Sequence, residues 1–287
     1  MKIFFNNEDF DGQFLRMLSY TAYGGADIGE CFETASRIKE GDRGSWYEAL
    51  TETANRVRQD SDRSLENGHK VSARRSYLRA SNYHRAAEFY VRDDPNDPRS
   101  LQGWQASHDC FAKAAELFDP PFEAVEIPYE GTTLPGYFFR VDDSGQRRPT
   151  AVTMTGMDGY LEETYFSVIA AALERGYNGL TYDGPGQGGV LRQRGVPLRA
   201  DWEKVVTPVV DFVLGRPGWT AIALSWWAEA SAAIWHHERL VVSIGWRLAW
   251  RILASSICLT WPQPVCPRRW VVRCKPTARP SSPSSTR

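Results

Sequence analysis

The hydrophobic positions of residues 9–119 recur at three- and four-residue steps, which is the spacing of amphipathic helices. Helix-breaking residues interrupt the pattern at spacings that suit five helices. These residues are Gly24, Gly25, Gly41, Gly68, Pro95 and Pro98. The clearest apolar stripe consists of Leu101, Trp104, His108, Phe111, Ala115 and Phe118. The pattern predicts an all-helical domain over residues 1–119.

Two features of this domain have a structural and a functional interpretation. His108 lies in the apolar stripe, so we interpret it as a core histidine with a satisfied hydrogen bond in preference to a catalytic or ligand-binding group. Residues 71–91 are apolar on more than one face, which predicts a helix in the middle of the bundle. The aromatic residues of this helix would suit a pocket for a flat substrate, but core packing is the favoured explanation.

The period of the pattern changes after Pro120 and Pro121. Residues 125–141 alternate apolar and polar positions around a Glu130-Gly131 turn, which predicts an antiparallel hairpin. A polar linker, a strand at 151–154, a helix beginning at Glu162 and a strand at 178–182 follow. This order predicts two parallel strands joined by a helix, within a second domain over residues 120–218. Asp201 is expected to cap one more helix.

The second of these strands gives way abruptly to a loop that can be neither helix nor central strand. Its residues are Asp183, Gly184, Pro185, Gly186, Gln187 and Gly188. Such loops occur where a parallel sheet meets its active-site edge, because glycine lets the backbone approach a ligand or a neighbouring turn. Taken alone, the loop is equally compatible with a plain surface turn.

With this loop, three features carry a family resemblance. They are the run from Tyr182 to Gly188 after a strand, the run TAVTMTGMDG at 150–159, and the pair Glu162 and Glu163. In these features the chain resembles the α/β-hydrolases with an N-terminal helical domain that include 2,6-dihydroxypseudooxynicotine hydrolase and esterase FrsA-like proteins. The resemblance covers most of the first 218 residues. It implies an α/β fold, with an α/β-hydrolase sheet that is incomplete in this chain and is preceded by the helical domain.

The resemblance also implies a chemistry, in which a Ser-His-Asp triad cleaves a C–C bond of a β-diketone-like or aryl ketone substrate, or an ester bond. The turn after the first strand would supply one backbone N–H of the oxyanion hole. Met157 is the candidate donor, Gly156 would let the backbone bend, and Asp158 is the alternative donor. Asp183 is expected to fix its loop by accepting backbone N–H groups rather than to serve as the triad acid.

The pair Glu162 and Glu163 has two interpretations of equal weight. The two carboxylates could be first-turn helix charges, which are favourable at the positive end of a helix, or they could contact the substrate.

The catalytic residues themselves are missing from the sequence as it stands. No Gly-x-Ser-x-Gly elbow occurs, since Ser225 lacks both glycines and Ser243 has half of the pattern. His236 and His237 have no acidic partner of the triad type, because no aspartate follows Asp211. We therefore expect no hydrolase activity from this polypeptide. The second class of function left open is a non-catalytic, truncated product whose helical domain only folds or binds a partner.

The composition of residues 219–287 differs sharply from that of the preceding chain. Eight of the 11 tryptophans fall here, with no Asp, Tyr or Phe and a single glycine, Gly245. Rereading the codons around Trp226 one base earlier permits Gly-Gly-Ser-Phe-Gly-Gly, which is a nucleophile elbow. We therefore interpret residues 219–287 as a frameshifted, poorly structured tail. Alternatives are an interfacial Trp/Arg-rich anchor or a zinc site at Cys258, Cys266 and Cys274, and both are disfavoured.

Composition narrows the partners. The 34 basic and 35 acidic side chains give no global charge that favours nucleic acid or an acidic membrane, which leaves a small neutral or anionic ligand open. The family resemblance implies a small-molecule carbonyl substrate. The five cysteines form no disulfide framework, and nothing indicates a metal or cofactor. The N-terminal apolar run is too short for a signal peptide, so we expect a cytoplasmic protein. The formation of a homodimer stays open.

Overall fold

The structure, a computed structural model, describes residues 2–94, 96–216 and 219–224. Five α-helices precede the strands, as the hydrophobic pattern predicts. They are α1 (Glu8–Ser19), α2 (Ile28–Arg37), α3 (Arg43–Glu66), α4 (Lys70–Glu88) and α5 (Pro98–Glu116), with a short 3₁₀-helix, η1 (Tyr20–Tyr23), after α1. The starts of four of these helices are capped by side chains that accept backbone N–H groups. The caps are Asn7, Asp27, Asp42 and Asp97.

The core of the helical domain forms around the aromatic ring of Trp46, which is fully buried. The Trp46 indole donates a hydrogen bond of 2.8 Å to the carbonyl oxygen of Ala86 in α4. Phe10 and Tyr90 pack against the indole, with ring centroids 5.0 and 5.3 Å away. All side chains from residue 80 to residue 88 of α4 are buried, which agrees with the predicted central place of this helix.

The strands form one mixed sheet in the order β1-β2-β4-β3-β5. The strands are β1 (Glu123–Tyr129), β2 (Thr132–Phe139), β3 (Arg148–Thr153), β4 (Asn178–Tyr182) and β5 (Trp219–Leu224). β1 and β2 form the predicted hairpin, and β2 pairs antiparallel with β4. β3 pairs parallel with β4, as the strand-helix-strand order predicts, and also parallel with β5.

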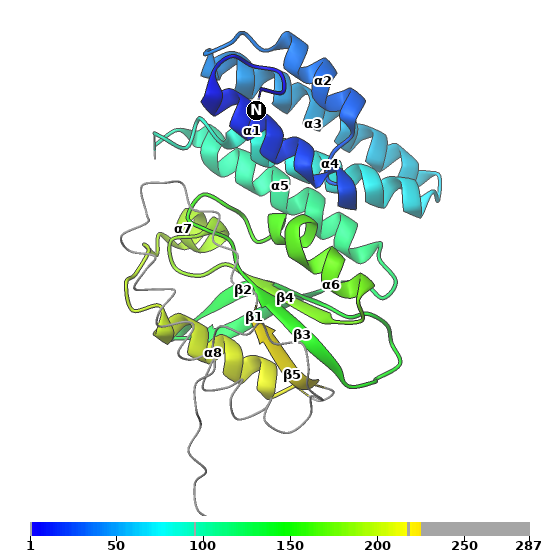
Figure 1. Ribbon diagram of the computed structural model, residues 1–287, viewed down its shortest axis with the longest axis vertical. Coiled ribbons are helices and arrows are strands. Elements are labelled where there is room, and N and C mark those ends of the chain that lie inside the picture. Colours follow the sequence, from blue (N-terminus) through cyan, green and yellow to red (C-terminus); the bar gives the residue numbers. More distant parts are fainter. Residues whose placement is uncertain (1, 95, 217–218, 225–287) are drawn as a thin grey trace, which may run out of the picture.

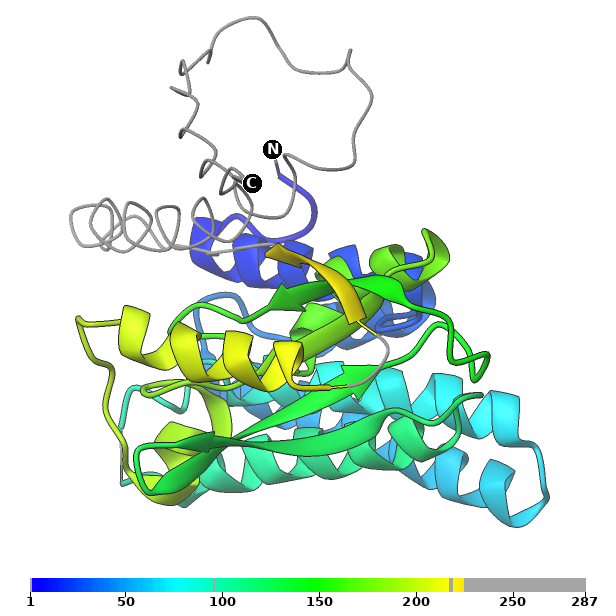
Figure 2. The same cartoon turned by 90° about the horizontal axis from the view of Figure 1, so that it is seen from below.

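Helices cover both faces of this sheet. The other helical segments are the π-helix η2 (Tyr165–Ile169), α6 (Ala170–Glu174), α7 (Gly188–Arg194) and α8 (Glu203–Leu214). α8 packs on one face through five valines, against side chains such as Leu180 and Phe138. η2 and α6 cover the other face, and α4 and α5 pack beyond them (Figure 1). In Figure 2, seen from below, α8 lies in front of the sheet.

Three details differ from the expectations or extend them. α8 begins after Trp202 without a side-chain cap, because Asp201 instead forms ion pairs with Arg199 and Lys204, so the predicted cap is wrong. The helix expected from Glu162 is in its middle a π-helix. Residues 219–224, the first of the sequence-predicted tail, form β5, while residues 225–287, with Ser225, Ser243 and both tail histidines, lie outside the described residues.

Candidate functional site

The turn after β3 and the loop after β4 meet because parallel neighbours end at the same edge of a sheet. The side chain of Gln187 joins them. Its Nε2 donates hydrogen bonds to the carbonyl oxygens of Thr155 and Gly156, and its Oε1 accepts the N–H of Gly184 at 2.8 Å. Gln187 is buried, so both halves of its amide are satisfied within the protein. The structure thus brings together two segments that the sequence singles out separately.

This contact indicates the direction of the Met157 N–H group. The Gly156 oxygen lies 3.3 Å from Gln187 Nε2. In a trans peptide the N–H points opposite to the C=O, so the Met157 N–H points away from Gln187. Among the described residues this N–H has no hydrogen-bond partner. The Met157 residue is half exposed, at 48%.

Asp183 lies completely buried at the end of β4. Its Oδ2 accepts the N–H of Gly189 in the first turn of α7 at 2.9 Å. A side chain at Gly188 would place its Cβ 1.9 Å from this oxygen, which explains why glycine stands there. Burial, and next the charge of Glu162, raise the pKa of Asp183 to about 7. The arrangement is that of a carboxyl group that holds its own loop.

Glu162 pairs with His108, which lines a cavity. Glu162 Oε1 lies 2.8 Å from His108 Nδ1, and the His108 ring stacks on Trp104 at 5.3 Å. Burial, the largest single influence, lowers the pKa of His108, but the hydrogen bond to Glu162 and the negative charges of Glu162, Asp109 and Asp183 together outweigh burial and raise it. The cavity measures about 280 Å³ and is also lined by Tyr137 and Asp183. The histidine therefore has the expected hydrogen bond, but its side chain is 32% exposed rather than enclosed in the core.

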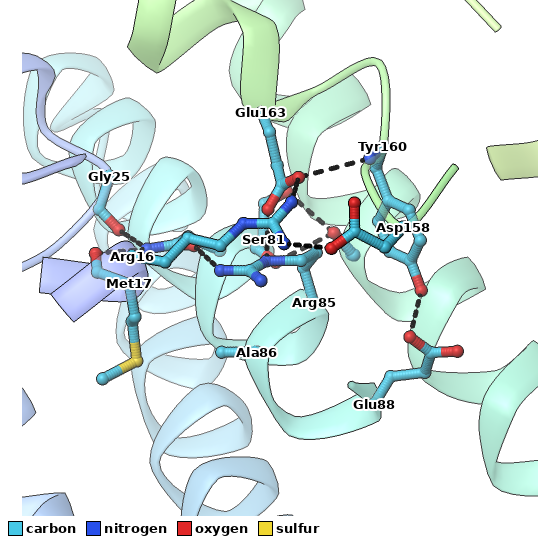
Figure 3. Close-up of polar contacts among 12 residues, drawn as sticks. Arg16, Met17, Gly25, Ser81, Arg85, Ala86, Glu88, Asp158, Tyr160 and Glu163 are labelled. Atoms are coloured by element: carbon cyan, nitrogen blue, oxygen red, sulfur yellow. Dashed lines mark hydrogen bonds and ion pairs between the residues drawn. The ribbon is translucent and has the colours of Figure 1, made fainter. Parts of the chain in front are cut away.

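Glu163 belongs to a separate, buried group of charges at the contact between the helical domain and the sheet (Figure 3). Arg16 of α1 and Arg85 of α4 each approach its carboxylate to 2.6 Å, and the Tyr160 N–H donates to it at 3.3 Å. Arg16 also pairs with Asp158 at 2.8 Å. Both glutamates thus have protein partners, and they lie in two different groups.

Sequence reasoning missed the arginines of this group. Arg16 and Arg85 lie on helices and Arg92 lies in the turn after α4, where an arginine is ordinary, and the partners cited here are distant in sequence. No short-range pattern marks them.

Neither a triad nor a metal site is formed by the residues that the structure describes. Within residues 2–94, 96–216 and 219–224, no serine is hydrogen-bonded to a histidine, and no His, Cys, Asp and Glu side chains are grouped as metal ligands. In the same ranges, no helix has both the length and the apolar character required to cross a membrane.

Sequence comparison finds hydrolases. The chain is 44% identical over 211 residues to a hydrolase from Fusarium sp, which covers 72% of this chain and 50% of the relative. It is 40% identical over 213 residues to a 20-hydroxy-prefusarin hydrolase from Gibberella moniliformis, covering 73% and 51%. It is 41% identical over 214 residues to an alpha/beta hydrolase from Aspergillus fumigatus, covering 72% and 48%. The chain therefore spans about half the length of the curated relatives it matches.

Structure comparison gives the same fold. The crystal structure of 2,6-dihydroxy-pseudo-oxynicotine hydrolase superimposes with a TM-score of 0.62 at 24% identity, over 73% of this chain and 57% of that chain. No protein-family model matches the chain.

Proposed function

We propose, from the premise that the chain belongs to the α/β-hydrolase family, that residues 120–224 carry part of the site of an enzyme that cleaves a C–C or ester bond of a small carbonyl substrate. The observation that carries the proposal is the hold of Gln187 on the turn after β3, which leaves the Met157 N–H directed away from Gln187 and without a hydrogen-bond partner among the described residues. An unpaired backbone N–H at this place is what an oxyanion hole requires. The name of one relative gives 20-hydroxy-prefusarin as what it acts on, and this supports a small-molecule substrate.

In the proposed reaction, a serine after β5 attacks the substrate carbonyl while a histidine takes its proton. The Met157 N–H then stabilises the negative charge on the carbonyl oxygen, together with the N–H of the residue after the serine. β5 ends at Leu224, so the elbow of this scheme would begin at the next residue. In the sequence that position holds Ser225, which is followed by two tryptophans and not by an elbow.

We further propose that this polypeptide does not turn over substrate, because a frameshift near the Gly218 codon replaces the elbow and the remaining triad. The match of about 72% of this chain to about half of each relative supports a break near this point. The second candidate is a non-catalytic product. Side chains of the helical domain and of the sheet share one buried cluster whose residues all precede 217, which favours a product that still folds.

Two experiments test these proposals. Resequencing the coding DNA should show the lost base, and an intact frame without an elbow in the alternative reading would refute the frameshift. The full chain should not hydrolyse an aryl ester or a dihydroxyphenyl ketone, and enzyme-level turnover would refute the inactivity. If turnover occurs, Met157→Pro, which removes the N–H, should lower kcat by about 100- to 1,000-fold. The matched control Met157→Ala keeps the N–H and should retain kcat.

A further inference from the structure

The turn formed by residues 156–159 is held at its other end by the helical domain. Arg92, just after α4, donates from Nη1 to the carbonyl oxygen of Asp158 at 2.6 Å. Arg16 of α1 pairs through Nη1 with the Asp158 carboxylate at 2.8 Å. The main chain and the side chain of one turn residue are thus both bound by arginines of the helical domain. Neither contact is explained by the pairing of β3 and β4.

We propose that Arg92 and Arg16 are positioning residues that fix the direction of the Met157 N–H. The inference rests on the proposed function, in which this N–H is the oxyanion donor. It adds that the helical domain shapes the site itself and is more than a cover over the sheet.

The backbone of the turn requires such a hold. Glycines stand at both ends, at 156 and 159, and glycine leaves φ and ψ free over a wide range. Gln187 holds the Gly156 carbonyl oxygen at 3.3 Å, and Arg92 holds the Asp158 carbonyl oxygen at 2.6 Å. Only one peptide unit lies between these two anchors. The Met157 N–H belongs to the peptide with the longer of the two hydrogen bonds, so with the Arg92 anchor removed the Gly156–Met157 peptide can turn away from Gln187 and carry the N–H with it.

Arg92 is itself rigidly placed. Its Nη2 contacts the carboxylate of Glu88, which is fully buried. The same carboxylate accepts the hydroxyl groups of Tyr160 and Ser100, each at 2.6 Å, and pairs with Arg192 at 3.1 Å. Arginine can hold Glu88 and the Asp158 carbonyl at once because its guanidinium is a planar fork with several donors. A lysine has one nitrogen and cannot span both acceptors in the same geometry.

Arg16 holds the side chain of Asp158 rather than its backbone (Figure 3). Its Nη2 lies 2.6 Å from Glu163, whose carboxylate also accepts the N–H of Tyr160, the residue that follows the turn. Gly159 packs closely here, since an added Cβ would lie 2.6 Å from Thr155 Cβ. The turn is therefore folded back on itself and fastened at Asp158 and Tyr160.

The test is NMR on the full chain labelled with ¹⁵N-methionine. The sequence has four methionines, and only Met157 lies in the turn, so Met17 and Met154 serve as internal references. In Arg92→Ala and in Arg16→Ala we expect the Met157 amide signal to shift and its order parameter to fall from about 0.85 to below about 0.6. The signals of Met17 and Met154 should stay in place in Arg92→Ala. In Arg16→Ala the reference is Met154, because Met17 follows the substituted residue directly. A general loss of structure would move the reference signals as well.

Arg92→Lys should give a Met157 order parameter between those of the wild type and Arg92→Ala. Arg43→Ala is the matched control, because it removes an arginine from an exposed ion pair with Asp93 and should leave Met157 unchanged. An unmoved Met157 signal in both alanine variants would overturn the proposal. If an alanine variant does not fold, an unmoved signal in Arg92→Lys and Arg16→Lys overturns it instead. The NMR experiment does not measure turnover. It can therefore fail or succeed independently of the substrate assays that test the proposed function.

Discussion

Replacing Glu163 with alanine should destabilise the protein strongly, because the buried Arg85 loses its counter-charge. Arg85 has a side chain that is 1% exposed, and its Nε lies 2.6 Å from Glu163 Oε1, close enough for an ion pair although not aligned as a hydrogen bond. Arg16, 11% exposed, keeps its second partner, Asp158. Arg85 is therefore the residue left uncompensated, next to an apolar part of the bundle.

The expected magnitude follows from the burial of this pair. Removing one partner of a buried ion pair costs about 3–5 kcal/mol, because the remaining charge cannot be hydrated. In a domain of this size each kcal/mol lowers Tm by roughly 2–4 °C, so Glu163→Ala should lower Tm by about 6–20 °C. The fall is measured by thermal unfolding followed by circular dichroism at 222 nm.

Two further variants distinguish the cost of leaving a buried charge unpaired from the cost of removing a carboxylate in general. Glu33→Ala removes a carboxylate that is 58% exposed and pairs with Arg37, so it should cost no more than about 1 kcal/mol. In the double variant Glu163→Leu with Arg85→Met no charge of this pair is left buried, and it should be more stable than Glu163→Ala. The reasoning is refuted if Glu163→Ala unfolds within about 1 kcal/mol of the wild type, or if the double variant is the less stable one.

Three other results are expected. Burial lowers the pKa of His84 from 6.5 to about 4. The stability present above pH ~6.5 should therefore be lost as the pH falls toward 4, by up to about 3 kcal/mol. Urea unfolding midpoints that depend on pH equally in the wild type and in His84→Leu would contradict this. Glu162→Gln should lower the pKa of His108 in an NMR titration, since the charged hydrogen-bond acceptor is lost; an unchanged titration curve would speak against the pair. Gly136→Ala should destabilise by about 1–3 kcal/mol in thermal melts, because its Cβ would lie 2.4 Å from the Thr181 carbonyl oxygen in β4, and a wild-type Tm would show that β2 can move aside.

The acid and alkaline limits of stability should have different origins. Protonation of His84 destabilises the fold at low pH. The raised pKa of Asp183 has the opposite effect on stability, because protonation of this carboxyl group stabilises the fold. Its neutral form is favoured in the fold, so its contribution is fully present below pH ~3.8 and is lost as the pH rises through about 7.

Much of the fold could be predicted from local pattern. The five helices follow from the spacing of apolar residues, and β4 covers residues 178–182, as its sequence indicates. The parallel pairing of β3 and β4 follows from the helix between them, because such a crossover returns the chain in the same direction. Local pattern was insufficient at Asp201, where nearby basic side chains compete for the carboxylate that was expected to cap α8.

The candidate site likewise has features that the sequence predicts and features that only the structure reveals. The sequence by itself determined the turn with Gly156 and Met157 and the loop with Gln187, because glycines and turn residues reveal backbone geometry without any distant partner. Only the tertiary structure decided what holds the turn. Arg16 and Asp158 are 142 positions apart, and an arginine on a helix has the same local sequence signal whether it meets water or a buried carboxylate. Such contacts depend on how the helical domain packs on the sheet, and that packing is a property of the whole chain rather than of any segment.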